Sequence, residues 1–270
     1  MKQKPDIQLQ YEGFLNTPIL WKSNQIEDLV QFEIPPTTLV PFQESIPIKM
    51  RLGKLVERFV SHELNQYDSI NILIENLQVI ENKITIGELD CLLKNENELI
   101  HLEIVYKFYL YDPNHCIQET GRWIGPNRKD SLIQKLTKLK EKQLPILFHK
   151  QTKLELEKLE INLSEIIQKT YFKAQLFVPY SKKISLLPEI NNDCIKGVYI
   201  QKNQLNDFNS HTFYIPSKMN WIIEANNNVN WMTFIDFLTE LKGLLNNEKS
   251  PLCWVKDSKG NIKKIFVVWW

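Results

Sequence analysis

The chain has 270 residues, of which 43% are hydrophobic and 11% aromatic, so it can bury a core large enough for one big domain or two small ones. Its 33 basic and 32 acidic residues leave a formal net charge of +1, which excludes a general basic field and requires any nucleic-acid surface to be a local patch. The four cysteines form no C-x-x-C pair, and no apolar run approaches the roughly 20 residues of a membrane helix. We therefore expect a cytoplasmic protein with reduced thiols and no membrane partner.

The first part of the chain predicts an irregular extension, a helix and a strand. Residues 1–48 are interrupted by prolines and predict an N-terminal extension, with a short helix or two, that wraps the core. Residues 49–64 carry a helical apolar pattern with Glu57 at the border of its buried side, and residues 71–80 predict a strand. Taken alone, Glu57 is best interpreted as an ordinary glutamate on a helix surface.

Two further strands, residues 84–93 and 99–110, are predicted around a polar turn at residues 95–98. Because the turn is short, the two strands should pair antiparallel and form a hairpin that is buried on at least one face. Side chains alternate along a strand, so Glu88 and Asp90 share one face of the first strand.

On the second strand of this hairpin, Glu103, Val105 and Lys107 share a face in the same way. Charged groups inside apolar strands are costly to desolvate unless they are paired, hydrogen-bonded or bound to a metal. If Asp90 and Glu103 are cross-strand neighbours, their carboxylates could converge on one cation. The alternative is a solvated sheet face, and His101, two residues before Glu103, is more commonly a structural histidine than a ligand.

A loop over residues 111–129 leads into a predicted helix that carries Leu132 and Leu136 and that Asp130 could cap. This is the most basic region of the chain, and it could contact phosphates through charge and through amide groups at the helix start. An equally common role for such lysines is to solvate a helix face. The candidate nucleic-acid-binding residues are Arg122, Arg128, Lys129 and Lys138, and Lys135 lies among them.

The pattern over residues 153–171 predicts a second, scaffolding helix, and residues 174–178 predict a buried strand. This strand would lie parallel to the strand over 99–110, because the helices between them provide a crossover. The remainder, residues 181–270, is rich in aromatic residues and predicts a helix at 231–245 followed by a final hairpin. Its tryptophans could stack on bases, although buried packing is the default for such side chains.

Two motifs of the central hairpin resemble the signature of the PD-(D/E)XK nuclease superfamily: GELD at residues 87–90 and EIVYK at residues 103–107. The resemblance implies an α/β (α+β) fold, with a restriction-endonuclease-like core of order αβββαβ and a mixed sheet flanked by helices. It also implies that Asp90 and Glu103 bind Mg²⁺ (or Mn²⁺) with Glu57 or Glu88 assisting. The signature has a lysine where this chain has Val105, so the implied catalytic lysine is Lys107 or Lys135.

Three other segments resemble the bacterial domain-of-unknown-function 1853 family, and this likeness spans most of the chain. They are WIGPNRKDSL at residues 123–132, Gln143-Leu144, and IPSKMNW at residues 215–221. This second resemblance implies no activity.

Together these observations divide the chain into an N-terminal extension (1–48), a nuclease-like core (49–180) and a C-terminal aromatic-rich α/β extension (181–270). The function that the nuclease resemblance implies is Mg²⁺-dependent hydrolysis of phosphodiester bonds in nucleic acid, with DNA favoured. The alternative is a non-catalytic nucleic-acid-binding or scaffold protein on a degenerate nuclease fold, in which the usual lysine position is filled by Val105.

Overall fold

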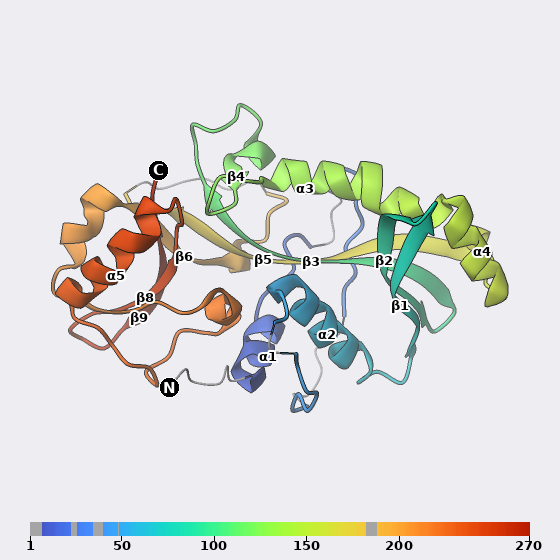
Figure 1. Ribbon diagram of the computed structural model, residues 1–270, viewed down its shortest axis with the longest axis horizontal. Helices are drawn as coiled ribbons and strands as arrows, with labels where there is room; N and C mark the ends of the chain where they lie inside the picture. Colours follow the sequence, from blue (N-terminus) through green and yellow to red (C-terminus); the bar gives the residue numbers. More distant parts are fainter. Residues whose placement is uncertain (1–6, 23–25, 35–39, 48, 182–187) are drawn as a thin grey trace.

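A computed structural model of the chain describes residues 7–22, 26–34, 40–47, 49–181 and 188–270 (Figure 1). Parts of the predicted N-terminal extension, namely residues 1–6, 23–25, 35–39 and 48, lie outside the described residues. The protein is mixed α/β, with a sheet flanked by helices.

Within the described residues, nine strands form one sheet in the order β1-β2-β3-β5-β6-β9-β8-β7, and β4 pairs with β3 beside this path. The neighbours β3, β5, β6 and β9 are parallel, and all other pairs are antiparallel. The sheet is therefore larger than the predicted αβββαβ core. The strands are β1 (Ile70–Glu81), β2 (Ile84–Asn95), β3 (Glu98–Tyr111), β4 (Trp123–Ile124), β5 (Ile166–Pro179), β6 (Ile195–Gln201), β7 (Thr212–Tyr214), β8 (Leu252–Lys256) and β9 (Ile262–Val268).

Helices cover both faces of this sheet, with α3 on one side of the central strands and α1 and α2 on the other (Figure 1). The α-helices are α1 (Ile7–Leu15), α2 (Leu52–Leu64), α3 (Leu132–Lys138), α4 (Lys150–Lys158) and α5 (Phe234–Asn246). Short 3-10 segments are η1 (Glu119–Arg122), η3 (Leu144–Phe148), η4 (Leu163–Glu165), η5 (Asn192–Cys194), η6 (Lys202–Phe208) and η7 (Lys218–Ile222), and η2 (Leu139–Gln143) is a π-helix.

The strand alternation of β3 decides which layer each of its side chains joins. Leu102 packs in a buried cluster with residues of α1 and α2, whereas Val105 and Tyr109 pack in a separate buried cluster with Leu132 and Leu136 of α3. Both faces of β3 are therefore dry over most of its length, as expected for a central strand with parallel neighbours.

The N-terminal segment covers the edge of β5 that β6 does not reach. Leu20 donates its backbone N–H to the carbonyl of Phe172 at 2.8 Å, and Phe32 donates to the carbonyl of Thr170 at 2.7 Å. Pairing of β5 with β6 begins at Leu176. The N-terminal segment therefore covers the first part of this edge of β5, and β6 covers the rest. This arrangement protects strand edges that would otherwise be open to other chains.

Polar side chains buried beneath α1 join both ends of the chain to the central strands. The Lys173 ammonium donates to the carbonyl of Phe14 at 3.1 Å, near the end of α1, where the helix dipole favours a cation. The Lys264 ammonium donates to Gln175 Oε1 at 3.0 Å and to the carbonyl of Trp221 at 3.1 Å. These hydrogen bonds fix α1 and η7 against β5 and β9.

The structure confirms the predicted helix at 49–64, the strands at 71–80, 84–93 and 99–110, the helix at 231–245 and the final hairpin. The predicted parallel pairing of the fourth strand with β3 is also confirmed. The hairpin turn is tighter than predicted, because Asn95 and Glu98 pair with each other and only two residues connect them.

Two local predictions were wrong. The predicted helix over 153–171 ends at Lys158, and β5 begins at Ile166, because Glu160 adopts a left-handed backbone and the following segment pairs with β3 over 12 residues. Tertiary pairing overrode the local helical pattern. Asp130 also does not cap α3, since the cap is Ser131, whose hydroxyl accepts from the Gln134 N–H at 3.4 Å.

Within the described residues, no helix is both long enough and apolar enough to cross a membrane.

Candidate active site

The candidate site lies where β2 and β3 separate. The two strands pair from Asn95 and Glu98 as far as Cys91 and Leu102, and their pairing stops there. At the next position Asp90 Oδ2 accepts the backbone N–H of Ile104 at 2.9 Å. The backbone N–H of Ile104 thus donates to a side-chain carboxylate in place of a backbone carbonyl of β2. This hydrogen bond holds Asp90 at the fork between the strands.

Glu103 follows on β3, and its side chain is fully buried. Its carboxylate accepts from His101 Nε2 at 3.2 Å and from Gln143 Nε2 at 2.6 Å. The Gln168 amide donates to His101 Nδ1 at 2.9 Å, so we assign the proton of the neutral imidazole to Nε2, where it points at Glu103. Two neutral donors therefore orient a buried carboxylate.

The π-helix η2 brings a lysine of α3 into this arrangement. Lys135 Nζ donates to Gln143 Oε1 at 2.6 Å, so the Gln143 amide bridges the ammonium and Glu103. Eight residues of a regular α-helix turn through about 800°, which would leave Gln143 about 80° away from Lys135 around the axis. The extra residue of a π-turn reduces this offset to about 20°, so the π-helix aligns the two side chains.

Two more carboxylates approach the fork from α2 and β2. The Lys54 ammonium donates to Glu57 Oε2 at 2.7 Å, to Glu88 Oε1 at 2.5 Å and to Asn76 Oδ1 at 2.8 Å. Glu57 is largely buried, whereas Lys54 is about half exposed. Lys54 thus holds Glu57 and Glu88 together at the rim of the site, where each lies within electrostatic range of Glu103.

Burial and mutual repulsion raise the proton affinity of three of these acids. Burial, and after it the Glu103 carboxylate, raise the pKa of Asp90 to about 7. Burial raises the pKa of Glu103 to about 7 against the attraction of Lys135. Burial likewise raises the pKa of Glu57 to about 7 against a hydrogen bond from Lys54, and the Asp90 carboxylate adds to the rise. The site therefore concentrates negative charge that its own cations only partly neutralise.

The two nitrogen bases of the site shift in the other direction. Burial lowers the pKa of Lys135 to about 8, although Glu103 opposes this shift. Burial also lowers the pKa of His101 to about 4, so the imidazole is neutral at physiological pH. Lys135 is thereby poised to exchange a proton near neutral pH, and His101 serves as a neutral hydrogen-bond donor.

Lys107 does not share this environment. Its ammonium forms an ion pair with Asp130 Oδ2 at 2.6 Å, and each of the two side chains is more than one third exposed. Val105, at the position where the nuclease signature has lysine, is buried against α3. Of the two predicted lysines, the structure brings Lys135 to the carboxylates, and it directs Lys107 to the loop before α3.

The candidate nucleic-acid-binding residues are spread along the length of β3. Arg122 pairs with Glu119 at 2.6 Å and Arg128 pairs with Asp112 at 2.7 Å, so both arginines lie beyond the carboxyl end of the strand. Lys129 is exposed beside them. Lys138 is exposed on the last turn of α3, close enough to Lys135 to affect its pKa.

The sequence interpretation missed two residues that organise the site, Gln143 and Lys54, and it favoured a structural role for His101. Gln143 occurs in one of the segments that carry the family resemblance, but its double hydrogen bond depends on a π-helix for which the sequence has no clear signal. Lys54 lies three residues before Glu57 on α2, and this spacing places the two on one helix face. His101 shares the strand face of Glu103, which alternation alone could have shown.

The raised pKa values predict how stability depends on pH. The stability contributed by Glu57, Asp90 and Glu103 is fully present below their unfolded pKa of about 4 and is lost as pH rises through about 7. Replacing Glu103→Gln should therefore flatten the decline of melting temperature between pH 5 and pH 8. His101 donates to Glu103 and loses its stabilising contribution as pH falls from 6.5 to about 4, so the part of the decline above pH 6.5 is the part that reports on the carboxylates. The measurement is thermal unfolding across this pH range.

A matched control for this experiment is Glu157→Gln, which changes an exposed glutamate of α4. It should leave the pH dependence of the melting temperature as in the wild-type protein. A Glu103→Gln protein with the same pH dependence as wild type would contradict the raised pKa assigned to the buried Glu103 carboxylate.

Among the residues that the structure describes, no group of three or more His, Cys, Asp or Glu side chains is arranged to hold a metal ion. The fork does place two coupled carboxylates, Asp90 and Glu103, beside one lysine, with Glu57 and Glu88 at the rim. Such a set can bind a hydrated cation through two oxygen ligands, and it can transfer a proton through Lys135.

A family model described as Domain of unknown function (DUF1853) matches residues 8–268. No curated protein and no solved structure matches the chain.

Proposed function

We propose that this chain, which belongs to the family described as Domain of unknown function (DUF1853), hydrolyses phosphodiester bonds of nucleic acid with Mg²⁺ or Mn²⁺ on a core of the PD-(D/E)XK nuclease type. The observation that carries the proposal is the cluster at the fork: Asp90 and Glu103 on adjacent strands, linked through Gln143 to a lysine. Strongly perturbed titratable groups that converge in this way are typical of catalytic sites.

The arrangement of elements supports the proposed core. Apart from the two-residue β4 between β3 and α3, the order α2, β1, β2, β3, α3, α4 and β5, with β5 parallel to β3, is similar to the αβββαβ order of that superfamily. The strands β6 to β9 extend the sheet on the side away from the fork. Glu57 of α2 lies within electrostatic range of Asp90 and Glu103 at the fork.

The donor set of the site fits a small divalent cation. Mg²⁺ prefers hard oxygen ligands, keeps several of its waters and is often held by one or two carboxylates together with substrate phosphate. Asp90 and Glu103 would be those ligands, with Glu57 or Glu88 contacting the bound waters, and a divalent charge would offset the burial, and after it the repulsion, that raise their pKa values. When bound, the ion would lower the pKa of a coordinated water and offset charge on the phosphate.

Lys135 supplies the charge that the signature assigns to a lysine on β3. Its ammonium is fixed by Gln143, and its pKa of about 8 allows it to orient an attacking water and to stabilise negative charge on the phosphate. Val105 cannot take this role, because it is apolar and buried. The proposed catalytic lysine thus lies on α3, which packs across β3, and not on the strand itself.

Nucleic acid is the proposed substrate, with DNA favoured on the strength of the resemblance. Exposed lysines near the fork, Lys138 in particular, would contact the phosphate backbone and make binding depend on salt. Arg122 and Arg128 already form ion pairs with acidic residues. They would therefore help to orient the nucleic acid more than they would add net positive charge.

One observation favours the alternative of a non-catalytic nucleic-acid-binding or scaffold protein. Lys54 neutralises Glu57 and Glu88 from within the protein, as a lysine that replaces a lost ion would do. Together with Val105 this contact is consistent with a degenerate nuclease fold.

Ion titration separates the two proposals. Mg²⁺ or Mn²⁺ should raise the melting temperature of the protein and support cleavage of single-stranded or duplex DNA, since a ligand selective for the folded state stabilises it by about 2.7 kcal/mol at 100 times its dissociation constant. The stabilisation should be larger at pH 8 than at pH 6, because Asp90 and Glu103 are ionised only above about pH 7. Melting curves and a gel assay of labelled DNA and RNA provide both measurements.

An equal ionic strength of KCl is the control for the titration. If neither ion changes the melting temperature and no DNA or RNA is cleaved, the enzyme proposal fails and the scaffold alternative stands.

A further inference from the structure

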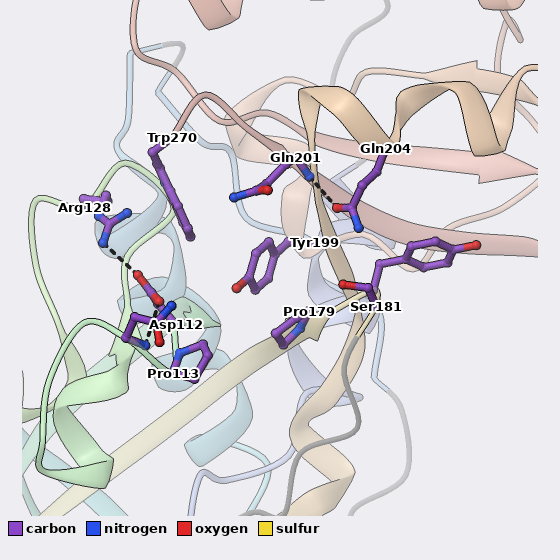
Figure 2. A pocket seen from close by; sticks show the side chains of 11 residues that line it. Asp112, Pro113, Arg128, Pro179, Ser181, Tyr199, Gln201, Gln204 and Trp270 are labelled. Atoms are coloured by element: carbon purple, nitrogen blue, oxygen red, sulfur yellow. Dashed lines mark hydrogen bonds and ion pairs between the residues drawn. The ribbon is translucent and has the colours of Figure 1, made fainter.

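A cavity of about 320 Å³ lies beyond the carboxyl end of β3, where Asp112 lines it (Figure 2). Asp112 follows β3, Pro179 ends β5, Gln201 ends β6 and Trp270 follows β9, so the cavity is located outside the carboxyl ends of four parallel strands. Open α/β sheets bind their ligands at this end, because the loops that leave the strands can diverge there. Its size is at the lower end of the range for small-molecule pockets.

The loop over residues 125–130 is held rigidly at one wall of this cavity. The Trp270 indole N–H donates to the carbonyl of Pro126 at 3.0 Å, and Asn127 Oδ1 accepts the N–H of Ser250 at 2.8 Å. Gly125 and Asp130 close the loop through a backbone hydrogen bond of 2.8 Å. Contacts from several parts of the chain thus fix a loop of six residues.

This fixed loop presents Arg128 in a strained conformation. Its φ of 56° lies in the left-handed region, which costs a residue other than glycine roughly 1 kcal/mol or more. The guanidinium stacks 4.4 Å from the centre of the Trp270 ring and donates to Asp112 Oδ2 at 2.7 Å. Figure 2 shows the arginine, the aspartate and the indole side by side at the cavity wall.

The chemistry of the lining narrows the class of ligand. Arg128 and Asp112 cancel each other's charge, so a phosphate alone has little to attract it. Aromatic surface comes mainly from the half-buried Trp270 ring, because the Tyr199 ring, centred 5.5 Å away and tilted by 50° to it, is buried. Gln201 and Gln204 add amide groups: Gln204 Oε1 accepts the backbone N–H of Gln201 at 2.9 Å, which leaves the Gln204 NH2 group as a donor and the Gln201 amide as donor and acceptor (Figure 2).

From these features we propose that the cavity binds a single unpaired nucleobase. A base offers a flat face for the aromatic rings and an edge with donors and acceptors for the glutamine amides, and it needs no net charge in the pocket. The source can be a free nucleotide or a single-stranded nucleic acid, and the second source rests on the proposed function.

The distance to the fork sets the length of strand that could occupy both sites. Nine residues separate Glu103 from Asp112, or roughly 30 Å at about 3.3 Å per residue of strand. A nucleic-acid strand stacked at about 3.4 Å per nucleotide covers this distance with roughly nine nucleotides. Oligonucleotides longer than this should bind more tightly than short ones, because two sites then act together.

The test is equilibrium binding in the presence of a chelator, so that no cleavage occurs. Probes are adenosine monophosphate, inorganic phosphate, a fluorescent single-stranded DNA of 12 nucleotides and the corresponding blunt duplex. Wild-type protein should bind the mononucleotide and the single strand, and Trp270→Ala should weaken both by about tenfold. Phosphate should not compete, and the duplex should bind less tightly, since its base edges are paired.

Trp231→Ala is a closely matched control. Like Trp270, the Trp231 indole donates to a backbone carbonyl, that of Asn227, and the Lys256 ammonium lies 4.4 Å from the centre of its ring. Unlike Trp270, it lies outside the cavity. This variant should bind as wild type does. Gln201→Ala, which changes an exposed side chain, provides a second variant in case Trp270→Ala unfolds, and it too should weaken binding of the mononucleotide.

Base binding is overturned if phosphate competes as well as the mononucleotide does, or if the folded Trp270→Ala and Gln201→Ala proteins bind as tightly as wild type. Either result would leave the cleavage test at the fork unaffected. Conversely, base binding by a protein that cleaves nothing would support this proposal and refute the nuclease.

Discussion

Replacing Asp90→Asn or Glu103→Gln is expected to reduce metal-dependent cleavage by at least about 100-fold while the protein stays folded. Either change removes one of the two buried carboxylates that would hold the ion, and an amide oxygen is a much weaker ligand for Mg²⁺. The measurement is the rate of cleavage at saturating Mg²⁺, together with the melting temperature of each variant with and without the ion.

The amide variants are preferable to alanine because of what Asp90 does in the fold. An asparagine oxygen can still accept the N–H of Ile104, whereas Asp90→Ala leaves that donor without its partner at a cost of about 1–3 kcal/mol. Asp90→Ala should therefore lower the melting temperature, and Asp90→Asn should not. Full activity in the folded Asp90→Asn protein would show that the fork is not the catalytic site.

The two candidate lysines should differ sharply when each is replaced by methionine. Lys135→Met is expected to lower the cleavage rate on the order of 100-fold, because its ammonium is fixed beside the carboxylates. Lys107→Met should cost less than about fivefold, since it removes a partly exposed ion pair with Asp130 and a charge that contributes to the lowered pKa of Lys135 without contacting the carboxylates. Cleavage rates measured from pH 6 to pH 9 should also lose their inflection near pH 8 in the Lys135 variant alone.

Gln143→Leu provides a further check on this assignment, because it breaks the link between Lys135 and Glu103 without removing either group. Its pH profile should shift even if its activity falls less than that of Lys135→Met. Equal losses from Lys107→Met and Lys135→Met would contradict the assignment of the catalytic lysine.

The central hairpin was predictable because local rules determine it. A short polar turn between two apolar runs sets the antiparallel register, and alternation then places Asp90 and Glu103 where they face the same fork. The helical pattern of α2 was equally clear, with its apolar residues on one side and Glu57 at the border.

The other features depend on contacts distant in sequence, which a local pattern does not contain. The first part of β5, residues 166–171, fell within the predicted helix, and its pairing with β3 and with the N-terminal segment makes it a strand. The role of Gln143 depends on the extra residue in η2, and the cavity needs four strand ends that lie far apart in the sequence. Arg128, predicted as a nucleic-acid contact, lies at this cavity, roughly 30 Å along the strand from Glu103.

The position of β9 has a consequence for how the protein is made. β9 lies between β6 and β8 in the sheet but follows both in sequence, and it also brings Lys264 to Gln175. A chain still on the ribosome would hold β6 with an open edge until residues 262–268 emerge. Pairing across such a long sequence separation is slow, so the sheet should be completed only after synthesis of this region. During that interval the exposed edge of β6 is the natural target for chaperones.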